Sequence, residues 1–558
     1  MLRLFPAITV IVLLLPVLAG LIGTVAPGFG YFPAVGGTSL SVQPFRDLFD
    51  WAGFRPALSL SLRTGLIATA ASLIITMVLL AGWHGTRAFR WVERVLSPLL
   101  SAPHAAAAFG IAFLIAPSGW IVRALSPWAT GWERPPDLLI VQDPGGWAMI
   151  AGLVAKEVPF LMLMSLAALP QTAPEHSLRI TAALGYGRVA GWFKAIFPRL
   201  YARIRLPVYA VLAYSLSVVD VAIILGPNTP PPLAVQVVKW MGDPDLSMRL
   251  VASAGAVVQL VLVIGVLCLW RLMELAVTYA GLHAIYGGHR MRRDGAVRAA
   301  GLGLGAMSAG MVILGLAGLA VWSVAGFWSF PNALPDAISS RSWMRFGPDL
   351  LHPLNHTFVI AGAATGIALI LTIACLEAEH RHALTPASRS LWILYLPLLV
   401  PQVAFLPGLQ AITLLLGGGT HLGMVVLGHL VFVLPYVFLS LAGPWRQWDA
   451  RFDTVGAALG VTPNARFWRV RMPMMVAPVL TALAVGLAVS VGQYLPTLLI
   501  GGGRIQTITT EAVALASGGD RRVIGVAGLV QTGAAMVGFA AALLLPRMLW
   551  RNRRGMRG

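Results

Sequence analysis

Charged residues are scarce in this chain: they make up 11% of its 558 residues, whereas an ordinary soluble domain has about 25%. Hydrophobic residues make up 58%. A chain with so little polar surface cannot be a soluble enzyme, and it is too apolar to be disordered. Cysteine is also rare. Cys268 and Cys375 both lie in apolar runs, which indicates small hydrophobic residues rather than a disulfide.

Lysine is equally rare, since the chain contains Lys156, Lys194 and Lys239 and no others. They are followed by Glu, Ala and Trp. A phosphate-binding loop, Gly-x-x-x-x-Gly-Lys, needs Ser or Thr after its lysine, so the chain lacks that ATP-binding motif. No His, Cys, Asp or Glu residues stand at metal-ligand spacing inside an apolar run. We therefore predict no metal site, no catalytic group and no enzyme activity.

Long apolar runs are what the chain does contain, and a helix needs about 20 mostly apolar residues to span a membrane. These runs predict an all-α polytopic membrane protein with about 12 transmembrane helices. The first run is also compatible with a cleaved signal peptide, because Arg3 precedes it, but it is long and no small-residue cleavage site follows. The runs cover residues 6–25, 59–82, 95–116, 147–169, 204–226, 250–276, 300–328, 355–376, 391–415, 421–442, 477–499 and 523–546.

The net charge of +19 comes from basic residues that lie mainly between the apolar runs. A nucleic-acid binder gathers its basic residues in a patch on a soluble surface, so we exclude nucleic acid as a partner. If the N-terminus is cytoplasmic, most of the Lys and Arg residues fall on the cytoplasmic side, as the positive-inside rule requires. We predict a multi-pass protein of the cytoplasmic (inner) membrane with both termini in the cytoplasm. The basic tail at 547–557 is expected to contact lipid headgroups.

The chain carries an internal repeat. Ala-Ala-Leu-Gly occurs at 182–185 and at 457–460, each followed thirteen residues after the glycine by a proline, Pro198 or Pro473. Two further landmarks pair at nearly the same separation along the chain, Pro159 with Pro435 and Gln259 with Gln531. In addition, Pro103 and Gly110 stand seven residues apart, as do Pro401 and Gly408. Six runs per half predict two parallel six-helix repeats around a central pathway. We assign 1–280 to the first half, 281–299 to a basic cytoplasmic linker and 300–558 to the second half.

Both copies of the Ala-Ala-Leu-Gly element lie in a long cytoplasmic loop between the fourth and fifth runs of their half. Each loop is expected to form two helices joined at the glycine, with Ser177 and Asp453 as helix caps. Small alanines allow close docking of another protein. We therefore single out Ala182, Ala183, Gly185, Pro198, Ala457, Ala458, Gly460 and Pro473.

This spacing resembles the cytoplasmic loop signature of binding-protein-dependent ABC importer permeases, which reads Glu-Ala-Ala, three residues, Gly, nine residues, Ile, one residue, Leu-Pro. Gly185 with Pro198 and Gly460 with Pro473 match it. The glutamate is absent from both copies, because Arg179 and Thr454 take its place, which puts its polar docking contact in doubt. The resemblance covers almost the whole chain, as two permease domains fused head to tail.

The resemblance is to fused permeases such as those of the ferric-iron and thiamine importers. It implies two separate ABC ATPase subunits, one docked on each loop, and a periplasmic or lipid-anchored solute-binding protein on the other side of the membrane. It implies no cofactor in the chain itself, because ATP binds to the partner subunits.

Ionisable residues inside apolar runs are costly in a membrane and are therefore candidates for function. Lys156 and Glu157 lie in the fourth run, where each either forms a structural ion pair with a neighbouring helix or belongs to the pathway. Asp220 lies near the external end of the fifth run, and Gln493 is its approximate counterpart in the eleventh. Both are candidates to line a central vestibule, and the alternative is a side chain wetted near the interface.

A secondary, ion-coupled transporter with twelve spans is the alternative function, since it also has parallel six-span halves. The long loops favour the importer, and so does the scarcity of acids inside the runs, where Glu157 and Asp220 alone qualify. A third interpretation, a polytopic membrane enzyme, would need a cluster of His, Asp or Glu at one membrane face, which the sequence does not show.

Overall fold

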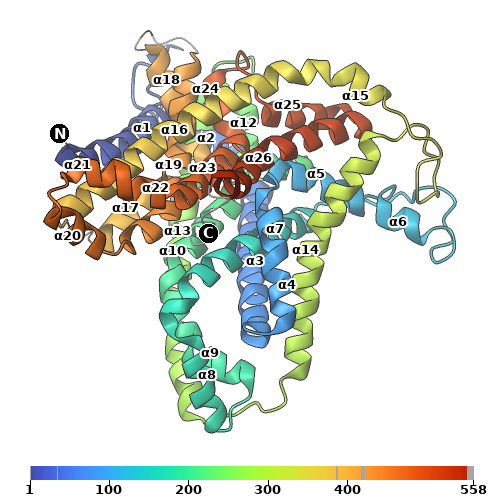
Figure 1. Cartoon of the computed structure of the whole chain (residues 1–558). Coiled ribbons are helices and arrows are strands. Elements are labelled where there is room, and N and C mark those ends of the chain that lie inside the picture. Colours follow the sequence, from blue (N-terminus) through green and yellow to red (C-terminus); the bar gives the residue numbers. More distant parts are fainter. Residues whose placement is uncertain (1, 34–35, 385–387, 416, 418–420, 550–558) are drawn as a thin grey trace.

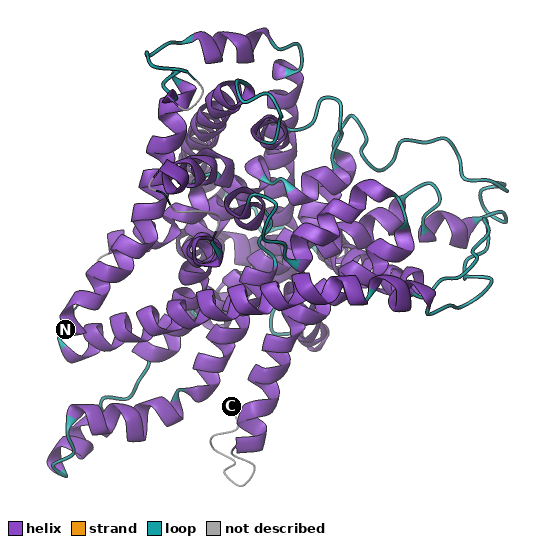
Figure 2. Cartoon of the chain, turned by 90° about the horizontal axis from the view of Figure 1, so that it is seen from above, coloured by secondary structure: helices purple, strands orange, loops and turns teal. Residues whose placement is uncertain are grey.

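The computed structural model describes residues 2–33, 36–384, 388–415, 417 and 421–549, and every regular element in this part of the chain is helical (Figures 1 and 2). The predicted all-α fold class is confirmed. Residues 550–557 of the basic tail lie outside the described residues. The long helices are α1 (Phe5–Gly28), α3 (Phe54–Trp83), α7 (Trp147–Ala168), α10 (Phe197–Ser217), α13 (Met248–Tyr286), α14 (Gly295–Ser323), α16 (Leu351–Arg381), α19 (Leu422–Arg446), α23 (Val476–Val491) and α26 (Arg521–Leu549).

Shorter helices complete and connect these. They are α2 (Gln43–Asp50), α4 (Arg87–Ser101), α5 (His104–Ile115), α6 (Trp120–Leu125), α8 (Pro174–Ala183), α9 (Arg188–Ala195), α11 (Asp220–Leu225), α12 (Leu233–Met241), α15 (Arg341–Phe346), α17 (Ser388–Leu399), α18 (Gln402–Leu415), α20 (Arg451–Ala458), α21 (Pro463–Arg466), α22 (Met472–Met474), α24 (Leu495–Gly501) and α25 (Ile508–Leu515).

The described helices include 9 that are long and apolar enough to cross a membrane, or up to 11 if each of two bent helix pairs is one span. The protein is therefore polytopic, as predicted, with somewhat fewer unbroken spans than the sequence suggests. The predicted run that is not among them is 204–226. There α10 carries Arg203 and Arg205 in its first half and ends at Ser217.

Four predicted runs are broken, at corresponding places in the two halves. Pro103 separates α4 from α5, and Pro401 separates α17 from α18, which meet at 86°. Proline lacks an N–H and disfavours the helical conformation of the residue before it, so a helix ends there. Non-helical backbone at membrane depth must find polar partners inside the protein, which makes the breaks candidate pathway positions. They lie at 102–103, 218–219, 400–401 and 492–494.

The first helix of each half packs against the other half: α1 lies along α18, and α14 lies along α5. Gly408 comes so close to Gly20 and Gly23 that a β-carbon on Gly408 would collide with the backbone of both. Gly110 and Gly315 meet in the same way at the second crossing. Glycine permits such close approach between membrane helices, so both crossings depend on it.

Corresponding helices make corresponding contacts elsewhere too. α3 packs against α7 and α10, and α16 packs against α19 and α23. In Figure 1, α8 and α9 project at the bottom and α20 and α21 at the left, whereas α6 and α15 lie at the right. This pattern supports the expected repeat, while its boundaries stay a prediction. α13 and α14 extend into the predicted linker, so the connection without helix is residues 287–294.

Candidate functional site

The first loop, residues 175–198, consists of α8 and α9 joined at Gly185, whose φ is +79°. The Gly185 N–H donates to the carbonyl of Ala182 at 2.9 Å, and the Tyr186 N–H donates to the carbonyl of Thr181 at 3.0 Å. These two bonds form a Schellman turn, which needs the left-handed conformation that glycine adopts without strain.

The second loop, residues 450–473, repeats this turn between α20 and α21. Gly460 has a φ of +71°, and its N–H donates to the carbonyl of Ala457 at 3.0 Å. The Val461 N–H donates to the carbonyl of Gly456 at 2.9 Å. The structure therefore has the predicted helix–glycine–helix shape in both loops, which we call the first and second coupling loops.

Each coupling loop leads into the following helix at a proline. Pro198 is the second residue of α10 and Pro473 the second residue of α22, positions at which a helix tolerates a missing N–H. In the second loop a π-helical turn, Phe467–Arg471, precedes the proline, and the chain bends by 70° between α22 and α23. The two loops therefore share the turn but differ in the path that follows it.

The predicted helix caps are wrong. α8 begins after Ala173 and α20 after Ala450, and neither residue has a side chain that could accept a hydrogen bond. The Ser177 hydroxyl instead donates to the carbonyl of Ala173 at 3.1 Å and accepts from Arg199 at 2.7 Å. Asp453 belongs to the ion-pair network described below. Both side chains that the sequence suggests as caps instead bond to residues elsewhere in the fold.

The tip of each coupling loop exposes an aliphatic pair one helical turn apart. Ile180 and Leu184 are 48% and 57% exposed, and their counterparts Val455 and Leu459 are 58% and 75% exposed. Large exposed aliphatic side chains of this kind, grouped on a protruding element, mark interaction surfaces. The alanines on the same helices are exposed as well: Ala182, Ala183, Ala457 and Ala458.

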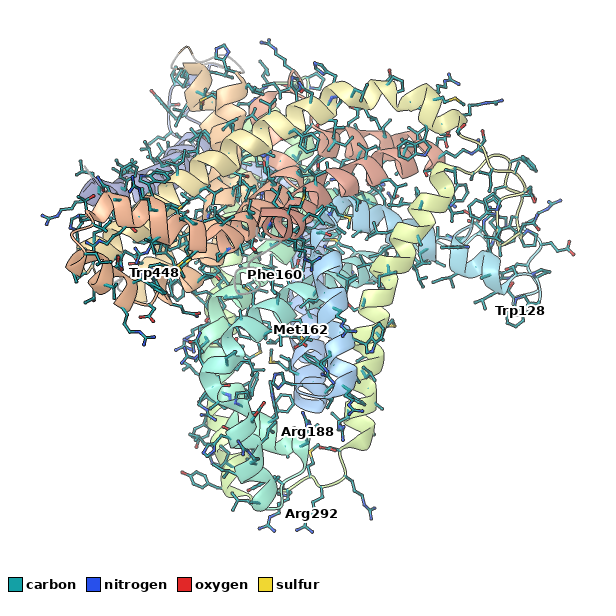
Figure 3. The ribbon with its side chains drawn as sticks, viewed as in Figure 1. Trp128, Phe160, Met162, Arg188, Arg292 and Trp448 are labelled. Atoms are coloured by element: carbon teal, nitrogen blue, oxygen red, sulfur yellow. The ribbon has the colours of Figure 1, made fainter. Side chains whose placement is uncertain are left out.

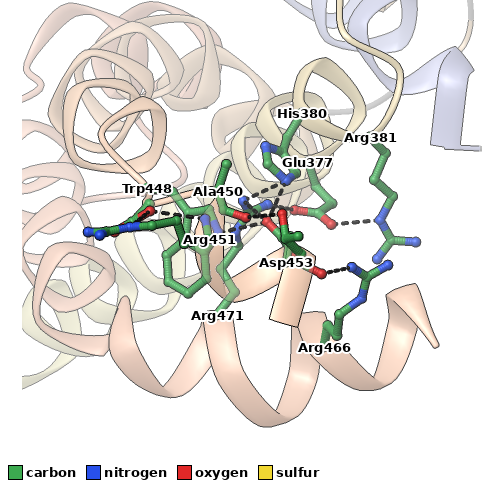
Figure 4. Close-up of polar contacts among 11 residues, drawn as sticks. Glu377, His380, Arg381, Trp448, Ala450, Arg451, Asp453, Arg466 and Arg471 are labelled. Carbon is green, nitrogen blue, oxygen red and sulfur yellow. Dashed lines mark hydrogen bonds and ion pairs between the residues drawn. The ribbon is translucent and has the colours of Figure 1, made fainter. Parts of the chain in front are cut away.

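A buried ion-pair network anchors the second coupling loop to the end of α16 (Figure 4). Arg471, 3% exposed, donates to Glu377 at 2.7 Å, and Arg381 donates to the other oxygen of Glu377 at 2.6 Å. Arg471 also lies 3.4 Å from Asp453, which accepts from the Trp448 indole at 2.8 Å. The base of the second coupling loop is thereby held directly to a long helix.

The first coupling loop is anchored differently. In the first turns of α10, which follows this loop, Tyr201 donates to Glu274 of α13 at 2.6 Å, and Glu274 also accepts from Arg271 at 2.7 Å. Arg188 of α9 donates to the carbonyls of Ala81 and His84 at the end of α3, the former at 3.2 Å. Burial at this place lowers the pKa of His84 below its usual value. Figure 3 shows Arg188 at this lower end of the molecule and Trp448 far from it, beside the second loop.

Among the predicted pathway residues, Lys156 has a structural partner. Its ammonium is 5% exposed and donates to the carbonyls of Leu99 and Ala102, at 2.9 and 2.6 Å, rather than to a carboxylate. These carbonyls belong to the end of α4, where the break at Pro103 leaves them without helical partners. A cation there also suits the negative end of the helix dipole. The expected ion pair is therefore replaced by a helix cap.

The other predicted pathway residues gather near the breaks. Glu157 is 4% exposed and Asp220 8%, and both lie within electrostatic range of Tyr214 on α10. Asp220 begins α11, directly after the break at 218–219. Gln493 is half-buried in the corresponding break before α24. The structure thus places Asp220 and Gln493 at equivalent breaks of the two halves, with Glu157 buried in α7.

Sequence reasoning used Gln259 and Gln531 as repeat landmarks but assigned them no role. Both are completely buried. Gln259 donates to the carbonyl of Leu216 at 3.0 Å, at the end of α10. Gln531 donates at 2.7 Å to Thr509, whose hydroxyl donates to the carbonyl of Val491 at the end of α23. Each glutamine therefore supports the broken helix of its own half.

His429 is a further buried residue that the sequence did not single out. Its two ring nitrogens lie 2.8 Å from the Ser490 hydroxyl and 2.9 Å from the Thr497 hydroxyl, which tie α19 to α23 and α24. The first half has no histidine at the matching position, so no repeat signal marked it. Within the described residues, no group of three or more His, Cys, Asp or Glu side chains could hold a metal ion.

No protein-family model matches the chain. It is 30% identical over 534 residues to the inner membrane ABC transporter permease protein YnjC of Escherichia coli (strain K12), covering 94% of this chain and 96% of that protein. The chain belongs to the ABC transporter permease family. This permease is also 30% identical, over 186 residues, to the molybdenum transport system permease proteins ModB of Mycobacterium bovis and Mycobacterium tuberculosis. That match covers 30% of the permease and 70% of each ModB chain.

Membership in the ABC transporter permease family confirms the prediction made from the two coupling loops. The likeness to YnjC extends over nearly the whole permease, which fits a fused two-domain protein. The permease is thus a multi-pass membrane protein and a transport subunit, and its E. coli relative is an inner membrane protein by name.

Proposed function

We propose that this permease forms the translocation pathway of an ABC importer, through which a small solute crosses after delivery by an external binding protein. Two separate ATPase subunits drive it, one docked on each coupling loop. The observation that carries this proposal is the doubled turn at Gly185 and Gly460, each with an exposed aliphatic pair beside it. Both termini and both coupling loops then lie in the cytoplasm, and ATP binds to the partner subunits.

The exposed tip of each loop carries an aliphatic pair, which in the first loop lies beside Arg292. The family's glutamate is replaced by Arg179 and Thr454, so neither loop offers a carboxylate at that position. Leu184 and Leu459, at the two tips, instead offer large exposed side chains flanked by alanines. Burial of one such leucine on a partner contributes about 1.5–3 kcal/mol. We therefore expect hydrophobic docking on both loops.

The proposed pathway runs between the broken helices. Broken helices in transporters supply backbone and side-chain groups near the middle of the membrane, where solutes bind. Glu157, Asp220 and Gln493 lie at or near these breaks. When ATP binding brings the ATPases together, the coupling loops move and the pathway changes from inward-open to outward-open. Hydrolysis then resets it.

Purification from native membranes in a mild detergent tests the proposal. An ABC ATPase should co-purify at two copies per chain and hydrolyse ATP. The variant L184E/L459E should lose this ATPase while its amount in the membrane stays unchanged, because a carboxylate opposes apolar docking. A matched control is L139E, since Leu139 is 66% exposed in the loop between α6 and α7 and should not affect docking.

If no ATPase co-purifies with the chain, and crosslinking at both loops finds none either, the importer proposal fails. Proton-driven uptake into liposomes would then test the alternative, a secondary transporter with twelve spans.

A further inference from the structure

The connection between the two halves lies against the first coupling loop. The Gly187 N–H donates to the carbonyl of Arg290 at 2.8 Å, and the Lys194 ammonium donates to the carbonyl of His289 at 3.1 Å. A β-carbon on Gly187 would collide with the carbonyl oxygen of Met291, so the close approach depends on glycine. Figure 3 shows Arg292, from the same segment, at the tip of this loop. The segment 287–294 is thus part of the first coupling loop in space.

Asp294 makes the most specific of these contacts. Its carboxylate is buried, at 7% exposure, and accepts a hydrogen bond from the Val189 N–H at 2.9 Å. Val189 lies in the first turn of α9, where backbone N–H groups need an acceptor. The residue before α9 is Gly187, which has no side chain to supply one. Asp294 therefore supplies, from a distant part of the chain, the N-terminal cap that α9 lacks.

The second coupling loop caps its own helix. Thr462 precedes α21, and its hydroxyl accepts from the Ala465 N–H at 3.3 Å. The two loops therefore obtain the same stabilisation by different means. Only the first, within the described residues, takes its cap from the connection between the halves.

Asp294 connects α9 to the helix that follows it in the chain, α14. Asp294 directly precedes Gly295, the first residue of α14. α14 in turn packs against α3, α5 and α26, and so touches helices of both halves. A displacement of α9 can therefore pass through one buried carboxylate into the first helix of the second half.

We propose that Asp294 is a positioning residue that couples the first coupling loop to α14, so that the loop and this helix move as one body in the transport cycle. The proposal rests on the function proposed above. In this proposal the connection between the halves transmits motion from the first coupling loop to α14 and does not only join the two halves. It also makes the two ATPase contacts unequal, because the second loop is held to α16 instead.

Two insertions of equal length test this link. Four residues, Gly-Ser-Gly-Ser, placed between Gly287 and Gly288 lengthen the connection before the contacts of His289 and Arg290 and leave those of Asp294 intact. The same four residues between Asp294 and Gly295 separate the docked segment from α14. Spin labels at Glu175→Cys in α8 and Ala299→Cys in α14, with Cys268→Ser as background, report the distance in the complex with its ATPase in lipid nanodiscs.

The distance between the labels should be the same in the nucleotide-free and the vanadate-trapped complex for the parent chain and for the first insertion. With the second insertion it should shift between the two states, and stimulation of ATP hydrolysis by the permease should fall. A shift that already occurs in the parent chain would overturn the proposal. So would identical behaviour of the two insertions.

Point variants separate capping from charge. Asp294→Asn keeps an acceptor for the Val189 N–H and should retain stimulation, whereas Asp294→Ala removes it and should lower stimulation about fivefold, as expected for loss of one cap. Equal activity of the Ala and Asn variants would refute the role of the cap. If no ATPase binds the parent chain, the proposed function itself fails, whereas an ATPase that stays bound to L184E/L459E refutes only the apolar docking contact. If that double variant loses the ATPase while Asp294→Ala behaves like the parent, only the further inference fails.

Discussion

The buried pair Glu377–Arg471 at the base of the second coupling loop supports a quantitative prediction. Glu377 is 5% and Arg471 3% exposed, and their atoms lie 2.7 Å apart. Removing one partner of a buried ion pair costs about 3–5 kcal/mol, because the other charge stays buried without compensation. Here each partner keeps a second contact, Glu377 with Arg381 and Arg471 with Asp453. We therefore expect Glu377→Gln to lower the free energy of unfolding by about 3 kcal/mol, the low end of that range.

Reversible unfolding in mixed detergent micelles measures this loss. The double variant E377Q/R471Q should lose less than the sum of the two single variants, because it leaves neither charge of the pair unmatched. Glu379→Gln is the matched control on the same helix. Its partner Arg446 is 41% exposed in the side chain, so the loss should stay below about 1 kcal/mol. Equal losses for Glu377→Gln and Glu379→Gln, or additive losses in the double variant, would refute this reasoning.

Three further predictions concern the glycines and the first loop. Gly408→Ala should cost about 1–3 kcal/mol in thermal or detergent unfolding, because its β-carbon meets opposing backbone, whereas Gly423→Ala, which faces open space, should be neutral. Gly185→Val combined with Gly460→Val should abolish ATP-driven transport while the protein stays in the membrane, and wild-type transport would contradict the coupling role. The lowered pKa of His84 favours its neutral form in the folded protein, so its contribution to stability is complete above its usual pKa of about 6.5 and is lost as pH falls below it. His84→Gln should flatten this part of the plot of melting temperature against pH.

Local features were the ones that the sequence could predict. The turns at Gly185 and Gly460 follow from hydrogen bonds within six residues, so a short motif is sufficient to foresee them. The apolar runs likewise predict helices because backbone groups in a membrane must be paired within each segment. The helix breaks at Pro103 and Pro401 could have been predicted from the effect of proline on a helix. These prolines were interpreted only as positions of the repeat.

Contacts between distant residues could not be predicted. Lys156 donates to carbonyls of a helix more than fifty positions away, and Glu377 accepts from Arg471 across 94 positions. Nothing in the local sequence of Asp294 indicates that it caps α9. Such pairings depend on how helices are arranged in space, which a single sequence without relatives does not reveal. For the same reason the sequence misplaced the partners of Ser177 and Asp453.

The exchange of first helices between the halves has a consequence for biosynthesis. α1 leaves the ribosome long before its partner α18, which begins only at Gln402. At about 5–20 residues per second, tens of seconds pass before that partner is made. During this time the glycine face of α1 around Gly20 has only lipid or the insertion machinery to contact. The contact between α1 and α18 can therefore form only after α18 has been synthesised and inserted, which makes it a late step in the assembly of the permease.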